Sequence, residues 1–268
     1  MSWIDALILG LVEGITEFLP VSSTGHLILA RSFLGLSAEQ VDWQLIVIQG
    51  AAILAVCWEY RARLWETVAG LPRERRAQRF ALMLILAFLP AAILGLLLDK
   101  PIERVLFAPI PVALALIIGG VLILLVERLR HGEHIGSVDE IRPSDALKIG
   151  LFQSLALIPG TSRSAATILG GLLLGLSRRT ATEFSFFVAI PTLLAATAYK
   201  LWQARHVIDT SQAAPLAISS IVSFVAALLS IRLLLRFVSR HSFAAFAWYR
   251  IGFGVLVLAA ALMGLVRV

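Results

Sequence analysis

The sequence predicts an all-α integral membrane protein with six transmembrane helices plus two re-entrant helical hairpins, arranged as an inverted-topology repeat. Three observations support this fold class. Hydrophobic residues make up 59% of the 268 residues, charged residues only 15%, and the mean hydropathy is +0.90. Uninterrupted apolar runs in the sequence are also long enough to cross a hydrocarbon core of about 30 Å. The chain also contains an internal repeat, and its arginines cluster at the ends of apolar segments.

The internal repeat consists of two short apolar segments, each interrupted by proline and hydroxyl side chains. The first begins at Ala6 and reaches a Pro-Val-Ser-Ser-Thr-Gly-His stretch at 20–26. The second begins at Ala146 and reaches a Pro-Gly-Thr-Ser-Arg-Ser stretch at 159–164. Interrupted apolar segments in corresponding positions of two halves indicate a binding site between the halves of a membrane protein.

In chain order the sequence predicts a hairpin over 3–34, three spans, a second hairpin over 145–176 and three more spans. Each hairpin segment should form two short helices, because proline ends a helix and the Ser and Thr residues after it favour a new helix start. Irregular backbone at membrane depth survives only where protein buries it or where it lines a cavity, so both segments are interpreted as re-entrant. The six spans are expected near 41–60, 80–98, 110–128, 181–202, 215–236 and 247–266.

The distribution of arginine predicts the orientation. Six arginines lie in the link 61–79, which is therefore expected on the cytoplasmic side. Counting spans from this link places the first hairpin as entering from outside and the second as entering from inside. We expect a single membrane domain over 1–268, with repeat halves at approximately 1–128 and 145–268 joined by a charged cytoplasmic linker at 129–144.

Composition argues against several other classes of protein. The lone Cys57 excludes an intramolecular disulfide and matches neither a zinc nor a redox pattern. The net charge of +6 would suggest nucleic acid for a soluble protein, but arginines at the ends of apolar segments fit anionic lipid head groups and topology signals better. No nucleic-acid partner is expected. The N-terminal segment also lacks the basic region of a cleaved signal peptide.

Two carboxylates in the first hairpin are candidate metal ligands. Glu13 and Glu17 are four residues apart and would share one face of a helix. Carboxylates inside a membrane segment are costly unless they pair, become protonated or bind a cation. Such a face suits Mg²⁺ or Ca²⁺ that also contacts a phosphate. The alternative is that one carboxyl group is protonated and only caps neighbouring backbone.

Hydroxyl, imidazole and guanidinium groups follow the two prolines. In the first hairpin, the hydroxyl cluster at 22–24 and His26 would by themselves fit a helix cap with a hydrogen-bonded core histidine. In the second, Arg163 lies among hydroxyls and Gly160 at an expected helix start, where free N–H groups and the helix dipole favour an anion. A guanidinium adds a planar fork that matches phosphate oxygens. The alternative is that Arg163 only neutralises Glu13 or Glu17.

The motifs resemble those of a known family. The run from Glu13 to His26 closely resembles the glutamate-rich motif of the undecaprenyl-diphosphate phosphatase (bacitracin-resistance) family, and the run from Pro159 to Ser164 resembles its second, arginine-containing motif. The resemblance covers the whole chain in length and in the order and spacing of motifs. Ala165 departs from it, because glycine is expected there, and this change affects local packing.

This resemblance implies an integral membrane phosphatase that removes the terminal phosphate of undecaprenyl diphosphate. It thereby implies recycling of the carrier lipid for peptidoglycan and other envelope polymers, and bacitracin resistance. Dependence on a divalent cation, location in the bacterial cytoplasmic (inner) membrane and a site that faces the outer side follow from the same resemblance, which is also compatible with a homodimer. The bilayer and a prenyl diphosphate lipid are the expected partners.

The motif residues receive roles on this basis. Glu13 and Glu17 are expected to hold the metal, Arg163 to hold the diphosphate, and His26 to act as acid or base. Ser23 is either the nucleophile or a hydrogen-bonding positioner, with activated water as the rival nucleophile. The expected substrate-binding residues are Ser22, Thr24, Gly160, Thr161, Ser162, Ser164 and Arg250, of which Arg250 fits an interfacial anchor equally well.

Two other classes of protein remain as alternatives. Inverted repeats with broken helices are typical of transporters, and a transporter or flippase of an anionic phospholipid or phosphate substrate would need similar anion-binding groups. Such a carrier needs Arg163 but has little use for His26 and two carboxylates. A structural scaffold is disfavoured by the charged groups inside apolar segments.

Overall fold

The computed structural model describes residues 1–129, 132–206 and 212–265, and every regular element within them is a helix. In these residues five helices are long and apolar enough to cross a membrane, and a bent pair brings the number to six. The prediction of an all-α integral membrane protein is confirmed. The five are α5 (Arg75–Leu106), α6 (Pro109–Leu129), α9 (Arg178–Ala204), α10 (Ala213–Val238) and α11 (Ala244–Leu262).

The bent pair corresponds to the first predicted span and part of the link after it. Helix α3 (Ala38–Glu59) is followed by α4 (Arg61–Gly70), and the described part of α3 makes an angle of 78° with α4. The arginine-rich link 61–79 is thus largely helical, and α5 extends well beyond the predicted 80–98. The length of an apolar run predicts the part of a helix that crosses the hydrocarbon core. It does not predict these helical extensions, because their residues are largely polar.

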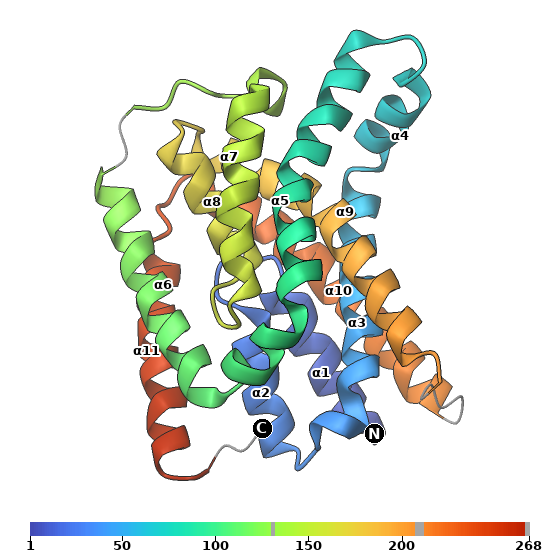
Figure 1. Cartoon of the computed structure of the whole chain (residues 1–268), viewed down its shortest axis with the longest axis vertical. Coiled ribbons are helices and arrows are strands. Elements are labelled where there is room, and N and C mark those ends of the chain that lie inside the picture. The colour runs from blue at the N-terminus through green and yellow to red at the C-terminus, as the bar shows by residue number, and fades with distance from the viewer. Residues whose placement is uncertain (130–131, 207–211, 266–268) are drawn as a thin grey trace.

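Both predicted hairpins are present as two helices around a break. The first consists of α1 (Trp3–Thr16) and α2 (Ser23–Phe33), and the second of α7 (Pro143–Gln153), the short η2 (Ser154–Leu157) and α8 (Arg163–Leu173). Figure 1 shows α7 and α8 in the upper half of the molecule and α1 and α2 in the lower half. The two hairpins therefore approach the middle of the molecule from opposite ends.

Each hairpin packs against the other half of the chain. Helix α1 packs on α10, and its counterpart α7 packs on α5, while α3 packs on α9 and α6 on α11. Close approach of α1 to α10 depends on glycine, because a Cβ atom at Gly10 or Gly14 would collide with the carbonyl oxygen of Ser219 or Ser223. Small residues spaced by four on both helices allow such contact within a membrane. This contact fixes the helix that carries Glu13.

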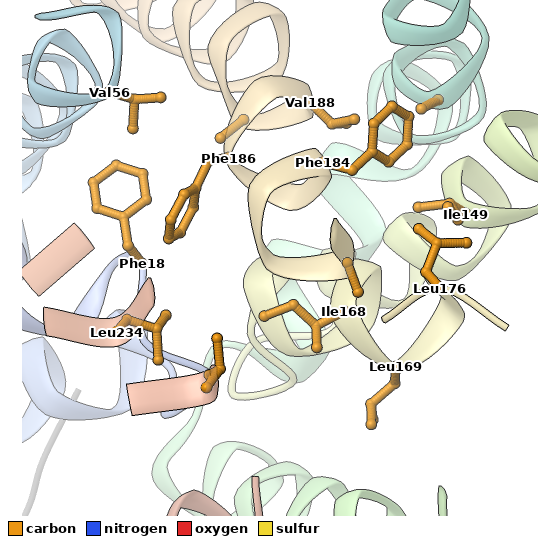
Figure 2. Close-up of a cluster of buried hydrophobic side chains, with 14 of the residues drawn as sticks. Phe18, Val56, Ile149, Ile168, Leu169, Leu176, Phe184, Phe186, Val188 and Leu234 are labelled. Carbon is orange, nitrogen blue, oxygen red and sulfur yellow. The ribbon is translucent and has the colours of Figure 1, made fainter. Parts of the chain in front are cut away.

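The break of the first hairpin is anchored in the hydrophobic core. Phe18 is fully buried and meets Phe186 of α9 edge to face, with ring centroids 5.7 Å apart. Figure 2 shows this pair beside Val56 and Leu234, which belong to α3 and α10. Aromatic pairs in this geometry add to the energy of burial. The break is consequently a packed segment whose polar neighbours are held in place.

Parts of three predictions lie outside the described residues. These are residues 130–131 of the linker 129–144, residues 207–211 between the fourth and fifth spans, and residues 266–268 at the end of the second repeat half, of which residue 266 ends the last span. The described part of the linker includes the short helix η1 (Val138–Glu140).

Candidate active site

The two helices that start after the breaks begin in the same way. Ser22 precedes α2 and Ser162 precedes α8, and their φ angles are 70° and 73°. Among the described residues these two are the non-glycine residues with positive φ. Such backbone strain persists only where the surroundings impose it and is concentrated at functional sites. Ser23 and Arg163 are therefore equivalent first residues of two helices that come from opposite halves.

These two residues converge on one carboxylate. The Ser23 hydroxyl donates to Oε2 of Glu17 at 2.7 Å, and the Arg163 Nη2 atom donates to Oε1 of the same residue at 3.4 Å. Glu17 directly follows α1 and is buried, with 6% of its surface exposed. Arg163 therefore pairs with a glutamate, as the alternative interpretation predicted, and the partner is Glu17. The contact also brings groups from both hairpins to a single point.

Further contacts tie the second hairpin to the first. Ser164 donates to the carbonyl oxygen of Leu19 at 2.9 Å, and Ser162 accepts from the N–H of Ala165 at 3.2 Å as a helix cap. Ala165, at the position where glycine is expected, is itself buried. The breaks of the two hairpins are thus held against each other by hydrogen bonds.

Arg163 is also held by α9, through a residue that sequence analysis did not identify. Its Nη1 atom donates to the carbonyl oxygen of Ser185 at 3.0 Å. Thr167 donates to the Ser185 hydroxyl at 2.7 Å. Ser185 is completely buried, and its only sequence signal is a hydroxyl within an apolar span. The Arg163 side chain is therefore fixed on two sides.

Several buried polar atoms around this point have no partner. Both carboxylate oxygens of Glu13, the hydroxyl of Ser22 and the Nε atom of Arg163 lack a hydrogen-bond partner among the described residues. Unpaired buried polar atoms are rare and need an explanation such as a ligand or ion. The donor at Arg163 suits an anion, and the acceptors at Glu13 suit a cation. The described residues contain no cluster of three or more His, Cys, Asp or Glu arranged as a metal site.

His26 lies one turn after Ser23 on α2 and faces α11. Its Nδ1 atom is 2.7 Å from the carbonyl oxygen of Ser22, and its Nε2 atom is 2.7 Å from the Tyr249 hydroxyl. A carbonyl oxygen only accepts, so Nδ1 carries a proton, and in the neutral form of the ring Nε2 accepts from Tyr249. The ring stacks on Phe253 with a centroid distance of 4.0 Å. Sequence analysis did not identify Tyr249, which lies 223 positions from its partner.

The other predicted substrate-binding residues lie in or next to the breaks. Thr24 is in the first turn of α2 and is partly exposed. Gly160 and Thr161 precede α8 and direct their carbonyl oxygens at Arg250. Arg250 is fully buried and donates to backbone carbonyls. It belongs to the support of the breaks, and its position differs from that of an interfacial anchor.

This fold and site define a class of protein: a multi-pass membrane protein with a polar site where two broken hairpins, distant in sequence, meet. Residues 6–256 match the family described as "Bacitracin resistance protein BacA". The chain belongs to this family, in agreement with the resemblance seen in the motifs.

Named relatives are similar along almost their whole length. "Undecaprenyl-diphosphatase 2" of Rhodospirillum rubrum is 58% identical over 264 residues, which cover 98% of this chain and 96% of the relative. "Undecaprenyl-diphosphatase" of Nitrosospira multiformis is 55% identical over 270 residues, which cover 100% of this chain and 99% of the relative. The protein of the same name from Methylococcus capsulatus is 54% identical and is covered to 97%.

Proposed function

We propose that this chain is a membrane phosphatase that hydrolyses undecaprenyl diphosphate to undecaprenyl phosphate and inorganic phosphate. Relatives that are more than half identical over the full chain bear the name of this activity. The reaction recycles a carrier lipid for cell-envelope polymers, and it accounts for the bacitracin resistance in the family's description. Family membership does not favour the alternative of a transporter or flippase.

The observation that carries the proposal is the junction of Ser23, Glu17 and Arg163. A hydroxyl beside a carboxylate is a nucleophile beside a proton acceptor. A guanidinium with an unused donor beside the same carboxylate can hold a phosphate oxygen. A carrier would need the guanidinium only, whereas hydrolysis through a serine nucleophile uses all three groups.

The proposed reaction follows from these positions. Arg163 and N–H groups at the starts of α2 and α8 bind the terminal phosphate and stabilise the charge that spreads over its oxygens. The Ser23 hydroxyl attacks the terminal phosphorus while its proton passes to Glu17. The bond between this phosphorus and the bridging oxygen breaks, and undecaprenyl phosphate leaves. Water then hydrolyses the phosphoserine, which releases inorganic phosphate and restores the hydroxyl.

His26 is proposed as the group that moves a proton near the leaving oxygen. Its Nε2 atom is hydrogen-bonded to the Tyr249 hydroxyl, and it is proposed to exchange this partner for the leaving oxygen during the reaction. An imidazole is suited to this task because its ordinary pKa lies near neutral pH. The remaining motif hydroxyls, on Ser22, Thr24 and Ser164, border the same two helix starts and are proposed to assist phosphate binding.

A divalent cation, Mg²⁺ or Ca²⁺, is proposed at Glu13 and Glu17. The buried and unpartnered oxygens of Glu13 fit such an ion, since binding a cation offsets the cost of an ionised carboxylate in this setting. When bound, the ion would neutralise charge on the phosphate oxygens.

The location is proposed from the same reasoning. A bacterial cytoplasmic membrane contains the lipid substrate, and the entry of the first hairpin from outside, as the arginine distribution predicts, supports a site that opens to the outer side. A homodimer is kept as a proposal, which crosslinking of the protein in membranes would test.

The direct test is release of phosphate from undecaprenyl diphosphate by the purified protein in detergent. We expect release that a chelator abolishes and added Mg²⁺ or Ca²⁺ restores. Replacement of Ser23 by alanine should remove release, with a loss of at least ~10³-fold if this residue is the nucleophile. A wild-type protein that releases no phosphate but moves the diphosphate lipid across a bilayer would contradict the proposal. A small loss in Ser23→Ala would instead identify water as the nucleophile.

A further inference from the structure

Arg250 occupies the centre of the contact between the two breaks. It lies on α11 and has no exposed surface. Each of its five N–H groups has a backbone carbonyl oxygen within hydrogen-bond distance, between 2.9 and 3.3 Å. The five acceptors are Pro20, Ala115, Leu116, Gly160 and Thr161.

These acceptors come from three separate parts of the chain. Pro20 lies in the break of the first hairpin, and Gly160 and Thr161 lie in the break of the second. Ala115 and Leu116 lie on α6, which packs along α11. The Nη1 atom links the two breaks directly, because it donates to the carbonyl oxygens of both Pro20 and Thr161. A single side chain therefore fixes both helix starts relative to each other.

The number of donors decides what Arg250 does. A guanidinium has five N–H donors and no acceptor, so all of its capacity is used by these carbonyls. Nothing remains for a phosphate oxygen, in contrast with Arg163, whose Nε atom has no partner. Lysine offers only three donors, so it would leave at least two of the five buried carbonyls unpaired.

We infer that Arg250 is a positioning residue that holds Ser23 and Arg163 in register by bridging the backbones of both breaks. The expected effect on the rate of phosphate release rests on the proposed function, whereas the expected effect on the distance between the hairpins does not. Loss of the bridge should let the two helix starts shift. A misplacement of about 1 Å at a catalytic group costs roughly 10²-fold in rate.

Two glycines supply a matched pair of variants. A Cβ atom at Gly119 of α6 would collide with the Arg250 guanidinium, so Gly119→Ala displaces the arginine without removing it. A Cβ atom at Gly252 of α11 meets nothing within 4 Å, so Gly252→Ala is the control. Arg250→Lys tests the number of donors directly.

The experiment measures both steady-state kinetics and the distance between the hairpins. Spin labels would be placed at Phe33 and Leu173, which are exposed at the ends of α2 and α8, in a Cys57→Ser background. For Arg250→Lys and Gly119→Ala we expect kcat for phosphate release to fall roughly 10- to 100-fold while KM changes less than about threefold. Their distance distributions should broaden, whereas Gly252→Ala should match the wild type in both measurements.

Other outcomes overturn the inference. A raised KM with unchanged kcat would make Arg250 a substrate-binding residue, and an unchanged distance distribution in both variants would remove the bridge. If Arg250→Lys fails to fold, Gly119→Ala still decides the question. If the wild type releases no phosphate, the proposed function fails, while the distance measurement still tests the bridge.

Discussion

Ser23 and Arg163 occupy the same backbone position in two inverted hairpins but supply different chemistry. Each is the first residue of its helix, after a serine with positive φ, and each contacts Glu17. One half of the repeat thus provides a hydroxyl and the other a cation. The symmetric backbone brings both to one carboxylate, and their difference makes the pair fit for acting on a phosphate.

The two glutamates lead to a first prediction. Glu17→Gln keeps only one acceptor oxygen, which can serve Ser23 or Arg163 but not both, and it removes the negative charge. Turnover should therefore fall about 10²- to 10⁴-fold, far more than folding is harmed. Glu13→Gln should also lower turnover, less severely, because the equivalent Gln153 is accommodated in the second hairpin, where it donates to the carbonyl oxygen of Ala87. Metal titrations of phosphate release and thermal unfolding would measure both effects. Near-normal turnover of Glu17→Gln at saturating metal would rule out its catalytic role.

A second prediction concerns the contact between His26 and Tyr249. His26→Ala should leave binding of a prenyl diphosphate largely intact and lower the rate of hydrolysis about 10²- to 10⁴-fold. Tyr249→Phe keeps an aromatic ring beside His26 and Phe253 but removes the hydroxyl, so it should shift the pH–rate profile at a much smaller cost in rate. Binding and hydrolysis would be measured on the same preparations. Equal losses of binding and rate in His26→Ala would point to a purely structural role.

Sequence reasoning identified most of the charged and hydroxyl groups of this site and missed their supports. Glu17 and Arg163 stand out because charge inside an apolar segment is costly. Ser185 and Tyr249 do not stand out, because a hydroxyl in a membrane helix is common and the partner of each lies far away along the chain. Arg250 was predicted to bind substrate or to anchor the chain at the membrane interface, because its backbone acceptors leave no signature in the sequence.

At the scale of elements, the charged linker between the two halves is held against the helices near it. Asp139 of η1 accepts hydrogen bonds from Arg63 of α4 and from Arg76 of α5, the latter at 2.6 Å. Partial burial alone would raise the pKa of the Asp139 carboxyl group, but the hydrogen bonds and charges of Arg76 and Arg63 hold this pKa below its usual value. The carboxylate therefore stays ionised at neutral pH, and α4 is joined to the linker.

A third prediction follows for this contact. Asp139→Asn should increase cleavage of the linker by proteinase K in inside-out vesicles, and Ser144→Ala, an exposed neighbour, should not. A carboxyl group with a lowered folded pKa stabilises above its unfolded pKa and loses that effect as pH falls through the folded value. Protection in the wild type should thus persist in mild acid and disappear only below the ordinary pKa of aspartate. Protection that fades near neutral pH would contradict this account.

At the scale of the whole molecule, the hairpins and spans were predictable because their signals are local. Proline, clustered hydroxyls and apolar length mark where helices break and where they cross. The exchange of partners, in which α1 packs on α10 and α7 on α5, was not predictable, because it depends on close contact at Gly10 and Gly14 with a helix that is distant in sequence. Helix α4 was not predicted, because the spans were assigned from apolar runs and α4 contains several polar residues.

A fourth prediction tests the orientation. Single cysteines at Val68 and Val105, both exposed, lie on α4 and at the far end of α5. In intact cells a membrane-impermeant thiol reagent should label position 105 and leave position 68 protected, because arginine-rich segments stay in the cytoplasm. Equal labelling of the two positions would contradict opposite entry of the hairpins.

The central claim is that one phosphoryl-transfer site is built jointly by both hairpins, and a double-mutant cycle tests it most directly. The measurement is kcat/KM for phosphate release from undecaprenyl diphosphate by the wild type, Ser23→Ala, Arg163→Lys and the double variant. Arg163→Lys keeps the charge but loses the planar fork, so it should weaken binding and turnover. If both residues act on the same phosphoryl group, the double variant should be little worse than the poorer single variant. Losses that multiply independently would contradict a shared site.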